Sequence, residues 1–157
     1  MFRKAAVPVA VAGPILAGVL SVRGADDVLR RCFSEARRRQ VGVRVLLAGP
    51  QAVAGEDALL RKLVDRWAGT YPDVPVSVAV RSGLDAAITL TAATRRCGLT
   101  VLAEPADAQQ TAVVQAVARR AYCPLIVVTP GLEIAEPAAS VVTVSRAEGR
   151  YGPAVAA

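Results

Sequence analysis

The chain has 157 residues, a length that suits one domain with a single hydrophobic core. Hydrophobic residues make up 54% of it and charged residues 20%, which argues against a disordered chain or a disulfide-stapled scaffold and is typical of a globular α/β protein. The formal charge is +6 and there is no histidine, so the commonest metal ligand and the usual proton shuttle at neutral pH are both missing.

The N-terminus begins with the basic stretch "MFRK", which an apolar run follows, as in a signal peptide or a weak membrane anchor. Pro8 and Pro14 interrupt this run, and its second half is needed as the first strand of the fold. We therefore assign residues 1–13 to an N-terminal extension and expect a cytoplasmic protein without a membrane segment. Secretion or anchoring is the alternative.

From residue 14 onward, short β-rich runs alternate with helical runs, which predicts βαβ units and a parallel sheet covered by helices. The predicted strands are Ile15 to Leu20, Val43 to Leu47, Val74 to Val80, Leu99 to Ala103 and Leu125 to Val128. Two helices between them have one apolar face each, formed by Val28, Leu29, Cys32, Phe33 and Ala36 and by Leu59, Leu60, Leu63, Val64 and Trp67.

A third helix is predicted from Asp85 to Cys97, with Gly98 as a left-handed C-cap. The fourth buries Val113, Val114, Val117 and Ala121. Asp107 and Gln110 predict a capping box at its start. Residues 131–157 lack helical periodicity and form a C-terminal tail, in which "SVVTVS" is a possible extra strand.

The three cysteines, Cys32, Cys97 and Cys123, are far apart and form no C-x-x-C pair, so neither a zinc site nor a redox motif is indicated. We expect them to be small core residues in a reducing cytosol, and we predict no metal site.

In a parallel α/β sheet the ligand crevice lies beyond the carboxyl ends of the strands. Four strand-to-helix connections lie there, "SVRGADD", "AGPQAVAGED", "RSGLD" and "AEPADAQQ". They carry the acids Asp26, Asp27, Glu56, Asp57, Asp85, Glu104 and Asp107, against the two bases Arg23 and Arg81. This excess of acidic over basic residues disfavours the binding of a polyphosphate.

Most of these acids are explained as helix caps or first-turn residues. Glu104 directly follows a buried strand and precedes Pro105, where a side chain can point into the crevice. Glu104 and Asp107 are therefore weak candidates for catalysis, because neither has an identified partner. Ser21 and Ser82 have no histidine to activate them, and no nucleophile elbow or P-loop occurs. Catalysis is not expected, although it stays open.

The arginines at 37–39, 95–96 and 119–120 fall at predicted helix C-termini, where cations complement the helix dipole. The sequence pI is about 9.9, yet aromatic residues make up only 4% of the chain and no stacking platform is apparent. We expect no specific nucleic-acid partner.

Three stretches of the chain carry a family resemblance. They are "PILAGVLSVRGADDVLRRCFSEARRRQVGVRVLLAG" at the start, "RSGLDAAITLTAATRRCGLTVLA" in the middle and "AVARRAYCPLIVV" at the end. Together they resemble the universal stress protein family. The resemblance covers residues 14–130. It implies a Rossmann-like, HUP-type domain whose open five-stranded parallel sheet has the order 3-2-1-4-5 and helices on both faces. It also implies a crevice lined by Leu20, Ser21, Gly49, Ser82, Gly83, Ala103, Glu104 and Thr111.

The chain departs from the pattern of nucleotide-binding members of that family. Leu20 and Ser21 stand where those members have Asp and Gly at the end of the first strand. Their phosphate motif is a Gly, two residues, a second Gly, nine residues, then Gly with Ser or Thr. Here Ala103 and Ala106 take the first two glycine positions, and the intervening loop is shorter. Glycine lets backbone N–H groups approach phosphate oxygens, so we expect no ATP and no other cofactor.

The leading interpretation is a non-catalytic, ATP-independent regulatory or stress-associated protein that acts through dimerisation and contacts with an unknown partner. The alternatives are a small-molecule-binding protein or enzyme that uses the crevice with Glu104 and Asp107, and residual ATP binding. Residues 125–128 are apolar on both faces although they should form a sheet edge. In the family this segment pairs across a two-fold axis, so we predict a homodimer with Leu125, Ile126, Val127 and Val128 at its interface. The alternative is that "SVVTVS" covers the edge within one chain.

Overall fold

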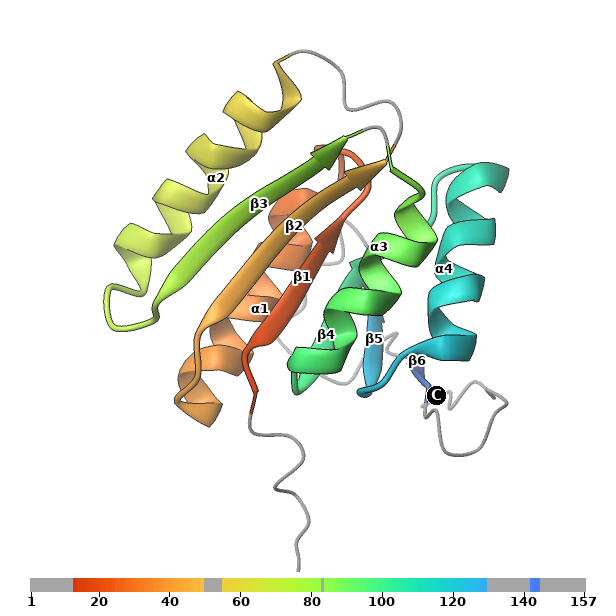
Figure 1. Cartoon of the computed structure of the whole chain (residues 1–157). Coiled ribbons are helices and arrows are strands. Elements are labelled where there is room, and N and C mark those ends of the chain that lie inside the picture. Colours follow the sequence, from red (N-terminus) through yellow and green to blue (C-terminus); the bar gives the residue numbers. More distant parts are fainter. Residues whose placement is uncertain (1–12, 50–54, 83, 130–141, 145–157) are drawn as a thin grey trace, which may run out of the picture.

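The structure is a computed structural model that describes residues 13–49, 55–82, 84–129 and 142–144. One six-stranded sheet has the order β3-β2-β1-β4-β5-β6 (Figure 1). Its strands are β1 (Ile15–Val19), β2 (Val43–Gly49), β3 (Val76–Ser82), β4 (Leu99–Ala103), β5 (Leu125–Val128) and β6 (Val142–Val144). The first five strands pair in parallel, so the predicted class and the order 3-2-1-4-5 are confirmed.

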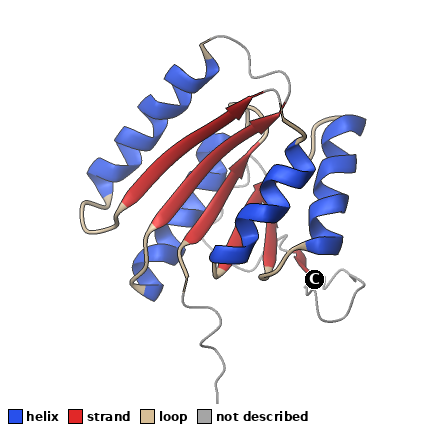
Figure 2. Cartoon of the chain, in the orientation of Figure 1, coloured by secondary structure: helices blue, strands red, loops and turns tan. Residues whose placement is uncertain are grey.

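Helices cover both faces of the sheet, as Figures 1 and 2 show. They are α1 (Ala25–Arg39), α2 (Glu56–Thr70), α3 (Ala86–Ala93), the 3₁₀ turn η2 (Thr94–Arg96) and α4 (Ala108–Arg120). Two hydrophobic cores result. The first lies between the sheet and α1 with α2, and the second lies between the sheet and α3 with α4. Every residue of β1 is buried, because this central strand borders both cores.

Two local predictions were wrong. The third helix ends at Ala93 and continues as the turn η2, and Gly98 is not a left-handed cap because Cys97 before it is already extended. The N–H of Gly98 donates to the carbonyl oxygen of Pro14 at 2.9 Å, so it belongs to the entry into the sheet. In α2, Leu60 and Val64 are buried, whereas Leu59 is 53% exposed. The same spacing is buried throughout in α1, so the pattern alone does not show how much of this face α2 buries.

The tail contributes a strand, as "SVVTVS" suggested. β6 pairs antiparallel with β5, with Leu125 opposite Val144 and Val127 opposite Val142. The edge of β5 is therefore paired within one chain, and the argument for a dimer from an open edge no longer holds. Leu125 and Ile126 are buried in one chain, at 0% and 8% exposure. The homodimer itself stays a prediction.

The N-terminal extension up to residue 12 and the rest of the tail lie outside the described residues. In the described part of the chain, no helix has the length and hydrophobicity that crossing a bilayer requires.

Candidate functional site

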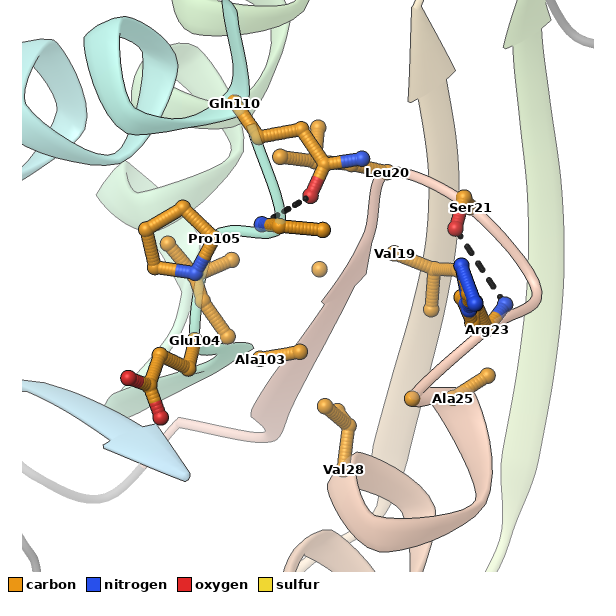
Figure 3. A pocket seen from close by; sticks show the side chains of 14 residues that line it. Val19, Leu20, Ser21, Arg23, Ala25, Val28, Ala103, Glu104, Pro105 and Gln110 are labelled. Carbon is orange, nitrogen blue, oxygen red and sulfur yellow. Dashed lines mark hydrogen bonds between the residues drawn. The ribbon is translucent and has the colours of Figure 1, made fainter. Parts of the chain in front are cut away.

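A cavity of about 340 Å³ lies at the carboxyl ends of β1 and β4 (Figure 3). The chain leaves β1 toward one face of the sheet and β4 toward the other, so this is the point where ligands bind in open α/β sheets. The volume is at the low end of the range for small-molecule sites. Its lining consists of Gly18, Val19, Leu20, Ser21, Arg23, Gly24, Ala25, Val28, Leu102, Ala103, Glu104, Pro105, Ala106 and Gln110.

The turn from β1 into α1 forms one wall. Ser21 Oγ accepts a hydrogen bond from the N–H of Arg23 at 3.2 Å. Gly24, the N-cap of α1, has a φ of 83°, which glycine adopts without strain, and no side chain caps the helix there. The Arg23 side chain is exposed, and no ion pair joins it to any carboxylate among the described residues. The wall therefore places one unpaired cation at the mouth of the cavity.

The floor of the cavity depends on a glycine. A Cβ atom at Gly18 would collide with the side chains of Leu102 and Leu90, which lie against β1 at this point. Gly18 therefore allows Leu102 to cross over the central strand. Val28 from α1 and Ala103 from β4 add apolar surface, as Figure 3 shows. The inner part of the site is consequently hydrophobic.

The connection from β4 into α4 forms the opposite wall, and its polar groups bond to one another. The Asp107 side chain caps α4 by accepting from the N–H of Gln110 at 2.8 Å. In return, Gln110 Oε1 accepts from the N–H of Ala106 at 3.0 Å. This confirms the predicted capping box, with the second bond made to the residue before the cap. Side chains of the chain itself thus occupy the start of α4.

Glu104 does not direct its charge into the cavity. It is exposed, and Figure 3 shows its carboxylate pointing away from Ala103 and Val28. Its backbone N–H donates to the carbonyl oxygen of Val128 at 2.9 Å, which continues the pairing of β4 with β5. Glu104 therefore lines the rim without facing the space in which a ligand would lie.

The remaining predicted crevice residues lie outside the cavity lining. Gly49 ends β2, and Thr111 Oγ1 donates to the backbone oxygen of Asp107 at 2.9 Å. Ser82 ends β3, while its side chain and Gly83 lie outside the described residues. The structure thus brings together Leu20, Ser21, Ala103 and Glu104 of the predicted set. Sequence reasoning missed the other ten lining residues, among them Arg23, Val28, Leu102 and Gln110, although Arg23 and Gln110 lie in connections that it had singled out.

Other acids of the crevice connections serve the fold. Asp26 Oδ1 accepts from the indole N–H of Trp67 at 2.8 Å and from Arg66 at 3.0 Å, which ties α1 to α2. Asp85 caps α3 by accepting from the N–H of Ile88 at 2.9 Å. In the described part of the chain, no group of three or more Cys, Asp or Glu side chains could hold a metal ion.

Comparison with solved structures identifies the architecture. The universal stress protein UspA from Lactobacillus plantarum superimposes with a TM-score of 0.56 at 18% identity, over 74% of this chain and 97% of that one. The chain has the universal stress protein fold. A universal stress protein from Archaeoglobus fulgidus DSM 4304 superimposes with a TM-score of 0.61 at 16% identity, over 83% of this chain and 49% of that one. Another universal stress protein from Archaeoglobus fulgidus, in complex with dAMP, has a TM-score of 0.51 at 22% identity, over 75% of this chain and 97% of that one.

No family model matches the sequence, and neither does any curated protein. At these identities the universal stress proteins share a fold with this chain, and the similarity carries no activity over to it.

Proposed function

We propose that this chain is a non-catalytic, ATP-independent regulatory protein with the universal stress protein fold. One observation carries the proposal. The α4 N-terminus, where the resemblance places the phosphate motif, already holds the Asp107 carboxylate, and the N–H of Ala106 already donates to Gln110. An anion at a helix N-terminus needs N–H groups without partners, and a carboxylate in that place repels phosphate.

Two further features support the same proposal. Ala103 and Ala106 carry Cβ atoms at the positions where the resemblance implies glycine. Leu20, at the end of the first strand, is apolar and packs against the second core, so it offers no hydrogen bond to a nucleotide. Residual ATP binding therefore has little support in this geometry.

Isothermal titration with millimolar Mg²⁺-ATP tests the ATP-independent part. We expect no saturable heat from the wild-type chain. A dissociation constant in the micromolar range would overturn the proposal. Asp107→Asn is the matched control, because it removes the charge and retains an N-capping side chain.

The cavity itself favours a second candidate function, the binding of a small and mostly apolar molecule. Its inner part is apolar, and the side chains of its lining that can donate are the Ser21 hydroxyl, the Arg23 guanidinium and the Gln110 amide, whose nitrogen lies on the side of Leu20 in Figure 3. Such a set fits an apolar ligand that carries one carboxylate. Catalysis has weaker support, since Glu104 points away and Asp107 caps a helix.

Native mass spectrometry and thermal-shift measurements with short-chain and medium-chain carboxylic acids test this candidate. We expect stabilisation by an acid that fits the cavity. Ala103→Leu, which fills the cavity, and Arg23→Gln, which removes the cation, should both abolish it. Stabilisation that survives Ala103→Leu would place the ligand elsewhere.

A further inference from the structure

A second surface lies at the other end of the strands from the cavity, where α3 and α4 end (Figure 1). We call it the η2–α4 corner and define it by Arg95, Arg96, Arg119, Arg120 and Tyr122. Two contacts join its halves. Thr94 Oγ1 accepts from the backbone N–H of Tyr122 at 2.9 Å, and Arg95 Nη2 donates to the Tyr122 hydroxyl at 3.2 Å. All four arginines are exposed.

The end of α1 shows what a balanced arginine cluster looks like in this molecule. Glu35 is buried at 8% exposure, and it pairs with Arg38 at 2.7 Å, Arg39 at 3.3 Å and Arg31 at 3.5 Å. That helix end therefore carries its own counter-charge.

Among the described residues, no such counter-charge lies at the η2–α4 corner. Within the described residues, none of its four arginines forms an ion pair with a carboxylate. A helix C-terminus offsets a nearby cation by only about 0.3–1 kcal/mol, and this effect fades within one turn. The corner therefore keeps a positive field, which attracts polyanions.

The side chains at the corner also indicate which polyanion fits. The planar fork of arginine binds phosphate oxygens in pairs. Tyr122 is 46% exposed, and the Arg95 guanidinium lies over its ring, 4.7 Å from the ring centroid. An exposed ring that already stacks with an arginine extends that stack to a nucleobase, and an acidic polypeptide chain has no planar base to add to it. Sequence reasoning found no platform because Arg95 and Tyr122 are 27 positions apart.

We propose that the η2–α4 corner binds single-stranded nucleic acid without sequence preference. The arginines contact the phosphates, and a base stacks on Tyr122. This goes beyond the proposed function, because it uses a different surface and needs no ligand in the cavity.

Fluorescence anisotropy with a labelled 20-nucleotide oligo-dT and the full chain tests the proposal. Four phosphate contacts on a single strand predict a slope of about −3 for log K against log salt. Affinity should accordingly fall about 50-fold between 50 and 200 mM salt. Arg96→Gln/Arg119→Gln/Arg120→Gln should remove most of the binding and bring the slope near −1.

The matched control is Arg61→Gln/Lys62→Gln/Arg81→Gln, which removes the same net charge from exposed positions on α2 and β3. We expect its affinity and slope to equal those of the wild type. Tyr122→Leu should weaken binding about fivefold or more and leave the slope unchanged, since it removes stacking and no charge. Circular dichroism shows whether each variant is folded.

Three results would overturn the proposal. The first is no binding at 50 mM salt. The second is an equal loss in both triple variants, which would reduce the effect to net charge. The third is polyglutamate binding as tightly as oligo-dT with Tyr122→Leu having no effect, which would indicate an acidic protein partner.

Discussion

Asp107→Ala is the substitution that tests most directly whether the start of α4 is already occupied. It removes the N-cap that accepts from the N–H of Gln110 at 2.8 Å. Losing an N-cap costs about 0.5–2 kcal/mol of stability. The bond from the N–H of Ala106 to Gln110 does not involve the Asp107 side chain, so we expect a loss of about 1 kcal/mol. In a chain of this size that lowers Tm by about 2–4 °C.

Urea unfolding followed by circular dichroism measures this loss. Asp107→Asn should stay within a few tenths of a kcal/mol of the wild type, because asparagine caps about as well. Asp57→Ala, an exposed first-turn acid of α2, controls for the loss of a charge near a helix N-terminus. Asp57→Ala should lower the free energy of unfolding by less than Asp107→Ala does.

The same variants test whether a vacated helix start binds an anion. With the carboxylate gone, inorganic phosphate can take its place, so phosphate should stabilise Asp107→Ala more than it stabilises Asp107→Asn or the wild type. Sodium chloride at matched ionic strength is the reference. If Asp107→Ala were as stable as the wild type, or phosphate stabilised all three chains equally, our account of the occupied α4 start would be wrong.

Other predictions concern assembly, pH and charge balance. Ending the chain at Gly131 removes β6 and exposes the edge of β5, so light scattering should show self-association beyond that of the full chain; a full chain that is monomeric at tens of micromolar would refute the homodimer. Burial raises the pKa of the Cys97 thiol from 9.0 to about 11. The unfolded thiol therefore ionises first, and the stability of the wild type relative to Cys97→Ala should be constant below pH 9 and fall toward pH 11. A stability difference between the two chains that does not change between pH 9 and pH 11 would contradict this prediction. Glu35→Gln leaves Arg31, Arg38 and Arg39 without their carboxylate and should cost about 1–3 kcal/mol in urea unfolding, against little change for Asp65→Asn on the exposed side of α2.

Hydrophobic periodicity was enough to predict the strands and the helices, whereas the order of the strands in the sheet came from the family resemblance. β1, β4 and β5 are short apolar runs between turn residues, and nothing competes with that pattern. β6 is only three residues long, so its place depends on a partner strand that the local sequence does not reveal. The end of the third helix was missed because residue type suggested a cap at Gly98, while the chain had to extend into β4.

The site was predictable to the extent that it follows the strand ends. Leu20, Ser21 and Ala103 line the cavity because they end or follow β1 and β4. The direction of Glu104 and the return of Gln110 to Ala106 depend on how the connection turns in space. Spacing predicted the capping box but did not show that it closes one wall of the cavity.

The position of β1 has a consequence for how the nascent chain folds. Ile15 pairs with Val43 on one side and with Leu99 on the other, and these partners leave the ribosome at very different times. The segment from β1 to β3 can form half of the sheet and the first core while β4 is still unsynthesised. During that interval the free edge of β1 and its Leu16 face remain uncovered. We expect this half-sheet to be the slow, chaperone-dependent stage of biogenesis, because it waits for the longest-range pairing in the molecule.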